Sequence, residues 1–288
     1  MKSVILISSI CILVAIAALW VWRLSDIRAE RRAGAALAAI QPARLDNFDA
    51  AMVAGLPEPA QRYFRFSIRR GTPLFTVARI TMTGQFSLGI REAPDYMAMT
   101  AQQVLASPEG FVWSMSARRG VMRISGSDGA VGDESWTRFW LMGLIPVARA
   151  GGTGDHWRSA FGRHVGEAVF WTPAALLPRP GVVWKAVDDT TARVTVTHNG
   201  IAQSVDVTVD AEGRPVTVVI PRWSDANPDK TWRLQPFGGH LSEFRDFGGF
   251  QLPTHVEADN QFGTDAYFPF FIADVTDITF IPSSVVRP

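Results

Sequence analysis

The sequence predicts a mainly β protein with α-helices: an N-terminal transmembrane helix, then a curved antiparallel sheet, an open half-barrel, covered by an inserted helical segment. Residues Ser3 to Trp22 carry no charge over twenty positions. Apolar residues alternate with period two from Leu74 and again after Val182, and helix-length apolar patterns lie between these stretches. Strands recurring about every 8–12 residues are typical of antiparallel sheets and barrels.

The uncharged run is long enough to cross a bilayer, because a helix rises about 1.5 Å per residue and the hydrocarbon core is about 30 Å thick. Trp20 and Trp22 end the run, where indole rings favour the headgroup level. A cleaved signal peptide is the main alternative, and small residues inside the run leave it open. Its apolar region would be only about 7–15 residues long, and Leu-Trp-Val-Trp-Arg is a poor cleavage site. We therefore predict an uncleaved anchor over residues 1–24.

Residues 25–55 are predicted to form a helical stalk or linker. Ala- and Arg-rich sequence without proline continues to Ile40, and Pro42 then ends the helix. Pro59 suits the first turn of a helix that runs through Tyr63. From residue 56 to residue 288 we predict a single β-rich domain, with a helical insertion at about 133–178.

The strand prediction depends on alternation. Phe75 to Thr83 has period two, as do Val205, Val207 and Val209, and Gly248-Gly249 is a tight turn. Thr100 to Ser107 is expected to form a short helix instead.

The predicted insertion contains two helix-length apolar segments, Ser135 to Ile145 and His156 to Phe170. In the second segment the apolar residues lie close to a single helical face, and Asp155 is a suitable N-cap. A further short helix is expected from Pro173 to Leu177.

Composition limits the function. The 288 residues hold 28 Lys and Arg against 27 Asp and Glu, a net charge of +1, so we predict no nucleic-acid partner. Cys11 is the only cysteine, which excludes an intramolecular disulfide. Ten Trp and 18 Phe are many for this length, and we expect part of this excess to line a core and part to line a cavity.

Three strings together resemble the motifs of an uncharacterised bacterial family of domain-of-unknown-function proteins. Leu56-Pro57-Glu58-Pro59-Ala60-Gln61-Arg62-Tyr63 is similar to its Leu-Pro-x-Pro-Val-x-Arg-Tyr opening, and Gly110-Phe111-Val112-Trp113 to its Gly-Phe-x-Trp strand. The segment from Arg163 to Leu177 resembles its Arg-Tyr-Leu-x-Glu and Trp-x-Pro-x-Ala-Leu block, with His164 in place of Tyr and an extra Phe170 before Trp171. The resemblance covers roughly residues 56–280 and carries no established activity.

The predicted architecture also resembles, more loosely, the lipoprotein carriers of the LolA and LolB type. That resemblance implies an open curved sheet with helices at its mouth and a cavity for acyl chains. It is an analogy of fold, and fold alone does not fix function.

The candidate ligand-binding residues form a predicted aromatic cover over the sheet. They are Phe139, Trp140, Leu144, Trp157, Phe161, Glu167 and Trp171. Ordinary core packing is the alternative for the aromatic members, because most aromatic side chains pack in cores. Glu167 among aromatic residues needs a partner or a proton. Arg163 lies four residues before it on the same helix, and a salt bridge to Arg62 or Arg65 is the structural alternative to a contact at the cavity mouth.

Neither catalysis nor a metal site has good support in the sequence. His164 and Glu167 have a possible helical ligand spacing, but no His-x-x-x-His or cysteine pair accompanies them. We therefore predict no catalytic residues, no metal and no cofactor.

The function predicted is that of a membrane-tethered binding protein that holds a lipid, an acyl chain or another apolar ligand in a sheet cavity. An enzyme with a polar cleft around Glu167, His164 and His156, or an anchored scaffold for a protein partner, are the alternatives. The predicted partners are the bilayer and a lipid or other apolar small molecule. We predict a single-pass protein of the bacterial inner membrane with its domain in the periplasm. Lys and Arg counts around the anchor favour the opposite side, whereas the short N-terminal tail favours this one.

Overall fold

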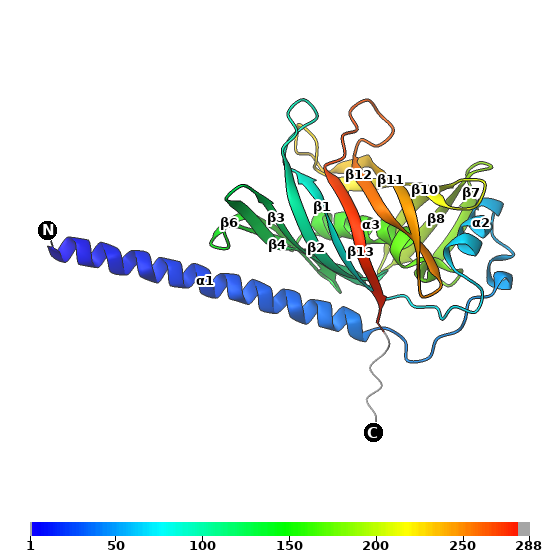
Figure 1. Ribbon diagram of the computed structural model, residues 1–288, viewed down its shortest axis with the longest axis horizontal. Coiled ribbons are helices and arrows are strands. Elements are labelled where there is room, and N and C mark those ends of the chain that lie inside the picture. The colour runs from blue at the N-terminus through cyan, green and yellow to red at the C-terminus, as the bar shows by residue number, and fades with distance from the viewer. Residues whose placement is uncertain (1, 282–288) are drawn as a thin grey trace, which may run out of the picture.

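The computed structural model describes residues 2–281 and contains one large antiparallel sheet (Figure 1). Its thirteen described strands lie in the order β6-β5-β4-β3-β2-β1-β13-β12-β11-β10-β9-β8-β7. The helices are α1 (Lys2–Ala39), α2 (Glu58–Ser67) and α3 (Gly154–Trp171), with 3-10 turns at Ala50–Val53 and Pro173–Leu176. The strands are β1 (Ala78–Ser87), β2 (Tyr96–Ala106), β3 (Gly110–Arg119), β4 (Met122–Val131), β5 (Glu134–Leu141), β6 (Ile145–Gly151), β7 (Val182–Ala186), β8 (Thr191–His198), β9 (Ile201–Val209), β10 (Pro215–Ser224), β11 (Arg233–Phe247), β12 (Phe250–Asn260) and β13 (Phe271–Phe280). The predicted fold, an open antiparallel sheet with a covering helix and a long apolar N-terminal helix, is confirmed.

The topology requires a helix across the open side of the sheet. The first and last strands, β1 and β13, pair at its centre, with Ile80 opposite Ile278. Each half of the chain meanders outward from this pair, so β6 and β7 become the two edges. The connection from β6 to β7 must therefore pass from one edge to the other. The 18 residues of α3, about 27 Å at 1.5 Å per residue, make most of this crossing.

Close packing fixes α3 against the second half of the sheet. Its N-cap is Thr153, whose hydroxyl accepts a hydrogen bond from the His156 N–H, so the predicted cap, Asp155, is wrong by two residues. Gly162 and Gly166 face β9 and β10. A Cβ at Gly162 would lie 2.8 Å from the Gln203 Oε1, so a larger residue at this position would require the Gln203 side chain to move.

The predicted helical insertion is wrong over its first part. Residues 134–151 form β5 and β6, and the helical structure is confined to α3 and Pro173–Leu176. On β5 the inward positions include Thr137 and Phe139, while Trp136 and Trp140 point to the outer face, where they are buried. Since both faces are covered, the strand lacks the alternation of polar and apolar residues that marks a half-buried strand.

The short helix expected at Thr100 to Ser107 is also wrong, because this segment belongs to β2. Residues 102 and 103 are glutamines, which have weak strand propensity. The strand forms through pairing on both sides, with Gln103 opposite Ile80 of β1 and Trp113 of β3.

The segment predicted as an anchor and the first part of the predicted stalk form one continuous helix, α1. Residues 2–39 include the one described helix that is long and apolar enough to cross a membrane. The second half of α1 lies against the outer face of β2, β3 and β4, where Leu37 packs with Val112 and Trp136. The first half extends beyond the sheet (Figure 1).

Candidate functional site

A cavity of about 560 Å³ lies between α3 and the inner face of the sheet. Both halves of the sheet contribute to it, from β1 to β6 and from β10 to β13. Its apolar lining includes Phe86, Met97, Trp113, Met115, Met122, Ile124, Phe139, Leu141, Val147, Phe170, Trp171, Val218, Ile220, Phe237, Leu241, Val256, Phe270 and Phe271. The volume and the apolar lining are those of a small-molecule site, which is commonly a concave pocket of about 300–1,000 Å³.

The aromatic surplus predicted from composition lines this cavity in part. Trp113 lies with its ring centroid 6.4 Å from Phe86, 6.3 Å from Phe139 and 6.1 Å from Phe271. These four side chains come from four different strands, so the sheet brings together residues that are far apart in the sequence.

A small polar group interrupts the apolar lining at Arg163 of α3. The Arg163 Nη1 donates to the Asp128 Oδ2 at 2.6 Å, and its Nε donates to the Glu167 Oε1 at 2.7 Å. Burial lowers the pKa of Arg163, but the charges of Glu167 and Asp128 outweigh it and raise the pKa overall. The helical pair predicted between Arg163 and Glu167 is therefore confirmed, and the predicted salt bridge from Glu167 to Arg62 or Arg65 is wrong.

The remaining oxygens of the two carboxylates have partners as well. The Thr137 hydroxyl donates to the Asp128 Oδ1 at 2.8 Å, and the Gln103 Nε2 donates to the Glu167 Oε2. Each carboxylate therefore has both oxygens hydrogen-bonded within the protein.

Arg222 of β10 is the second cation on the cavity wall. Its Nε donates to the Ser159 Oγ at 3.3 Å, and its guanidinium carbon lies 4.8 Å from the Phe237 ring centroid. Burial lowers the pKa of Arg222 to about 10, and the charge of Arg163 adds to this effect while Asp128 and Glu167 oppose it. Arg222 therefore stays protonated at neutral pH.

The structure divides the seven predicted site residues into two groups. Phe139, Glu167 and Trp171 line the cavity. The other four predicted residues, Trp140, Leu144, Trp157 and Phe161, lie outside its lining.

Each of these four has another location. Trp140 points to the outer face of β5, where its Nε1 donates to the Asp26 Oδ2 at 2.9 Å. Leu144 lies in the β5–β6 turn. Trp157 donates to the Gly132 carbonyl and stacks on Phe161 with ring centroids 5.3 Å apart, so these two aromatics pack with each other. The predicted aromatic cover does not form as one surface, because its first part is the strand β5, whose neighbouring side chains point to opposite faces of the sheet.

Sequence reasoning missed Asp128 and Arg222. A signal for Arg222 was present, because Arg222 follows Val218 and Ile220 at the two-residue spacing of one strand face. An arginine in an inward register is uncommon in a core and indicates a functional position. Asp128 lies in the segment Ser125-Gly126-Ser127-Asp128-Gly129, whose composition is typical of a loop although it is part of β4.

The histidines of the enzyme alternative do not gather at the cavity. His164 is buried between the rings of Phe161 and Phe111, and burial, with smaller contributions from His198 and Arg163, lowers its pKa to about 3. His156 Nδ1 lies 2.8 Å from the Ser135 Oγ. Neither histidine lines the cavity. Within residues 2–281, no three His, Cys, Asp or Glu side chains gather in a cluster able to hold a metal ion.

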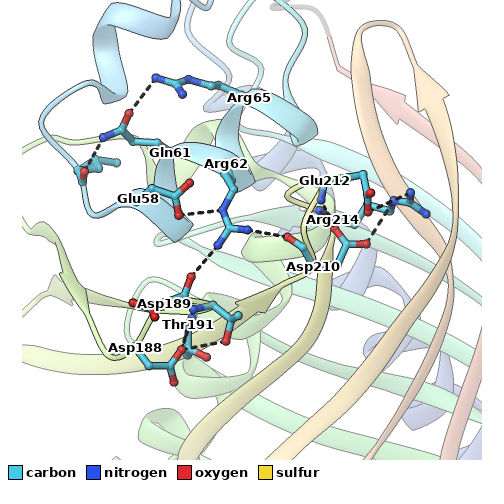
Figure 2. Close-up of polar contacts among 12 residues, drawn as sticks. Glu58, Gln61, Arg62, Arg65, Asp188, Asp189, Thr191, Asp210, Glu212 and Arg214 are labelled. Carbon is cyan, nitrogen blue, oxygen red and sulfur yellow. Dashed lines mark hydrogen bonds and ion pairs between the residues drawn. The ribbon is translucent and has the colours of Figure 1, made fainter.

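The motif residues near Arg62 have structural contacts outside the cavity. The Arg62 Nε donates to the Glu58 Oε2 at 2.8 Å, and its Nη groups donate to the carbonyls of Asp210 and Asp189 at 3.1 and 2.7 Å (Figure 2). The Tyr63 hydroxyl donates to the Val169 carbonyl at 2.5 Å. The Leu-Pro-x-Pro-x-x-Arg-Tyr motif thus ties α2 to the strand turns and to the end of α3.

The chain belongs to a family of unknown function, DUF6544. The family model matches residues 46–272. The family resemblance found in the motifs is therefore confirmed, and the motif contacts above explain part of it as fold maintenance.

Comparison with solved structures finds weak similarities only. A domain from Vibrio parahaemolyticus named for outer membrane lipoprotein sorting aligns at 10% identity and a TM-score of 0.36, over 71% of this chain and 85% of that one. A LolA superfamily protein from Nitrosomonas europaea aligns at 12% and 0.35, over 77% and 91%. A DUF1329 family protein from Desulfovibrio piger aligns at 10% and 0.33, over 80% and 92%.

Two of these names correspond to the carrier group that the predicted architecture resembles. TM-scores this low add nothing to what the cavity itself indicates. No curated protein matches the sequence.

Proposed function

We propose that this protein is a membrane-tethered binding protein that holds a lipid, or the acyl chain of a lipid, in the cavity under α3. The observation that carries the proposal is the cavity of about 560 Å³, whose wall is apolar apart from the polar group around Arg163 and the side chain of Arg222. An apolar void of this size is unfavourable when empty and gains free energy when an apolar chain fills it, at about 25 cal/mol per Å² of apolar surface removed from water.

The tether is α1. The uncharged run ends at Trp22, and the contacts of the helix with the sheet begin there: the Trp22 ring lies 5.4 Å from Trp140 and 4.6 Å from the Arg149 guanidinium carbon. The Arg23 Nη2 donates to the Ser125 Oγ at 3.2 Å. These contacts support a domain that lies directly at the membrane end of the tether, and we propose that the tether spans the inner membrane with the domain on the periplasmic side.

Two hairpins, β3–β4 and β5–β6, lie on the side of the sheet near the tether, and they support the entry of a ligand into the cavity from the bilayer. The green strands β3 to β6 lie nearest to the N-terminal half of α1 (Figure 1). Their turns expose Val121, Met142 and Ile145, and Val121 is 93% exposed. Met142 is two residues beyond Trp140, which contacts Trp22. Met122, Leu141 and Val147 of the same hairpins line the cavity, so the apolar wall continues from the cavity to the edge beside the anchor.

The test is native mass spectrometry of the full chain released from its purified membrane complex. We expect one bound amphiphile per chain. Ala258→Trp places an indole in the cavity from β12 and should remove the ligand, because the wall at Ala258 faces the void. Ala202→Trp, on an exposed position of β9, is the matched control and should keep it. A chain that is empty, or an Ala258→Trp variant that carries the same ligand as the wild type, contradicts the proposal.

The position of the hairpins has its own test. In a Cys11→Ser background, spin labels at Met142→Cys and Val121→Cys should lie at headgroup depth in nanodiscs, measured by relative collision with oxygen and an aqueous nickel complex. A label at Val187→Cys, exposed in the β7–β8 turn, is the aqueous control. If the two hairpin labels are as accessible to the nickel complex as the control label, the proposal that the ligand enters at this edge of the sheet is wrong. A reporter fused to the C-terminus tests the side of the membrane.

A further inference from the structure

We propose that the cavity selects an amphiphile with an anionic head, and that Arg222 binds this head. The inference rests on the proposed function and adds the chemical class of the ligand: a hydrocarbon chain that ends in a carboxylate or a phosphate. No residue of the sequence-predicted site has this role.

The hydrogen-bond partners of the polar group on the cavity wall lead to this assignment. All four carboxylate oxygens of Asp128 and Glu167 accept a hydrogen bond from Arg163, Thr137 or Gln103. The cavity therefore has no free carboxylate for a cationic ligand. Arg163 is likewise held in place by two carboxylates, at 2.6 and 2.7 Å.

Arg222 lacks the carboxylate partners that hold Arg163 in place. It makes one hydrogen bond, from its Nε to Ser159, and no carboxylate oxygen of the described residues lies within 4.0 Å of its guanidinium. Its Nη1 and Nη2 groups have no acceptor among residues 2–281. Since a guanidinium offers five N–H donors in a planar fork, four donors of this cavity-lining residue remain without an acceptor among the described residues.

Two other unpaired donors belong to residues of the cavity wall. Trp113 and Trp171 line the cavity, and their Nε1 groups have no acceptor among the described residues, but both groups are themselves buried. Trp113 also lies 5.0 Å from the guanidinium carbon of Arg163, which is already paired. The unpaired donors that a ligand head rich in acceptors can reach are therefore those of Arg222.

The geometry also accounts for the ligand chain. Arg222 stands on β10 after the inward-facing Val218 and Ile220, and its guanidinium lies over Phe237. A head bound at its Nη groups leaves the apolar wall from Trp113 to Val147 for the chain. A hydrocarbon chain that fills the cavity excludes water from it, which strengthens a charge-assisted hydrogen bond to the head.

The experiment uses the full chain in nanodiscs and two photoreactive probes of equal length. One is dodecanoate and the other is dodecanol, each with a diazirine on the chain. Labelled residues are mapped by mass spectrometry, and the apparent affinity comes from the yield as probe concentration rises. We expect the acid to label cavity residues at a concentration roughly ten- to a hundredfold lower than the alcohol, the range for a lost hydrogen bond to a charged group.

Three variants separate the role of the charge from the role of the fold. Arg222→Met keeps the length of the side chain and should abolish the preference for the acid over the alcohol. Arg222→Lys keeps the charge without the fork and should keep part of the preference. Arg245→Met is the matched control, because Arg245 also lies beside a phenylalanine ring, at 5.4 Å, but does not line the cavity.

The outcomes distinguish this inference from the proposed function. If both probes label the cavity equally and Arg222→Met changes neither, the inference is wrong and the binding function stands. If neither probe labels any cavity residue in the wild type, the binding function itself fails. Dodecyl phosphate and inorganic phosphate are then compared as competitors of the dodecanoate probe. If 10 mM inorganic phosphate displaces the probe as well as dodecyl phosphate does, the hydrocarbon chain does not contribute to binding. That result would show a simple anion site and overturn the proposal of an amphiphilic ligand.

Discussion

The sheet carries two buried charge clusters on opposite faces, one under α1 and one inside the cavity, and they differ in how completely their members are paired. Under α1, the Asp26 carboxylate accepts hydrogen bonds from Trp140 and Arg149, and Arg138 lies 4.0 Å away. This acidic side chain is only 6% exposed. In the cavity, Arg163 is equally well paired, but Arg222 beside it has no carboxylate partner.

The difference separates a structural contact from a binding surface. A buried charge without a partner costs free energy, so it persists where another function requires it. The cluster under α1 is complete and holds α1 against the sheet. The cavity cluster retains unpaired donors, which is the condition for binding an external acceptor.

The largest effect is expected from Arg163. Arg163→Met leaves Asp128 and Glu167 without their common cation in a buried space. We expect the free energy of unfolding to fall by about 3–5 kcal/mol, the range for a broken buried ion pair. Chemical denaturation of the full chain in detergent micelles measures it. A loss below about 1 kcal/mol would show that Arg163 is not the structural member of the cavity cluster.

A somewhat smaller effect is expected under α1. Asp26→Ala removes the acceptor for Trp140 and Arg149, and because the Arg149 side chain is 31% exposed, we expect a loss of about 2–3 kcal/mol. The same denaturation experiment gives the value, and Asp26→Asn, which keeps an acceptor oxygen, should recover part of it. Photolabelling of the cavity should not change. A loss of labelling in Asp26→Ala would contradict the separation of the two faces.

His164 extends the comparison to a buried group that has no charged partner. Burial lowers its pKa to about 3 from about 6.5. Between these values the unfolded chain binds a proton that the folded chain does not, so stability is lost as the pH falls below 6.5. The loss is about 2 kcal/mol at pH 5.

His164→Tyr, which restores the residue of the family motif, should remove this acid sensitivity. Unfolding free energies at pH 7 and pH 5, compared between the variant and the wild type, measure the change. An equal pH dependence in both proteins would mean that His164 is not the group responsible.

The smallest effect on stability is expected from Arg222. Arg222→Met removes a cation that has no carboxylate contact, so the free energy of unfolding should change by less than about 1 kcal/mol or rise. The thermal midpoint of the full chain in nanodiscs measures it. A fall as large as that of Arg163→Met would assign Arg222 to the structural network and count against its role in binding.

The sequence predicted the sheet, α3 and the long apolar N-terminal helix because each has a clear periodicity or length. It failed at β5, where Trp136 and Trp140 are buried by α1 on the outer face while Phe139 faces the cavity. A strand covered on both faces has no polar side, and aromatics three and four positions apart imitate a helix. That covering comes from α1, more than a hundred residues earlier, and no local pattern reveals it.

The sequence also identified only part of the cavity lining, and one of its errors follows from the error at β5. Glu167 and Trp171 on α3 were found, because α3 is a regular helix with a distinctive motif. Trp140 was misplaced together with β5. Arg222 was missed because its importance depends on the missing partner for its charge, and the absence of a partner is a property of the folded arrangement.

Adjacent positions on β5 provide the most direct test that the inner face binds a ligand and the outer face binds the anchor. The photoreactive p-benzoylphenylalanine replaces Phe139 in one protein and Trp140 in another, and both are irradiated in native membranes. At Phe139 we predict a covalent adduct with the mass of an amphiphile, and at Trp140 a cross-link to α1 within the chain. An absence of any lipid adduct at Phe139, with the expected cross-link still formed at Trp140, would contradict the binding function.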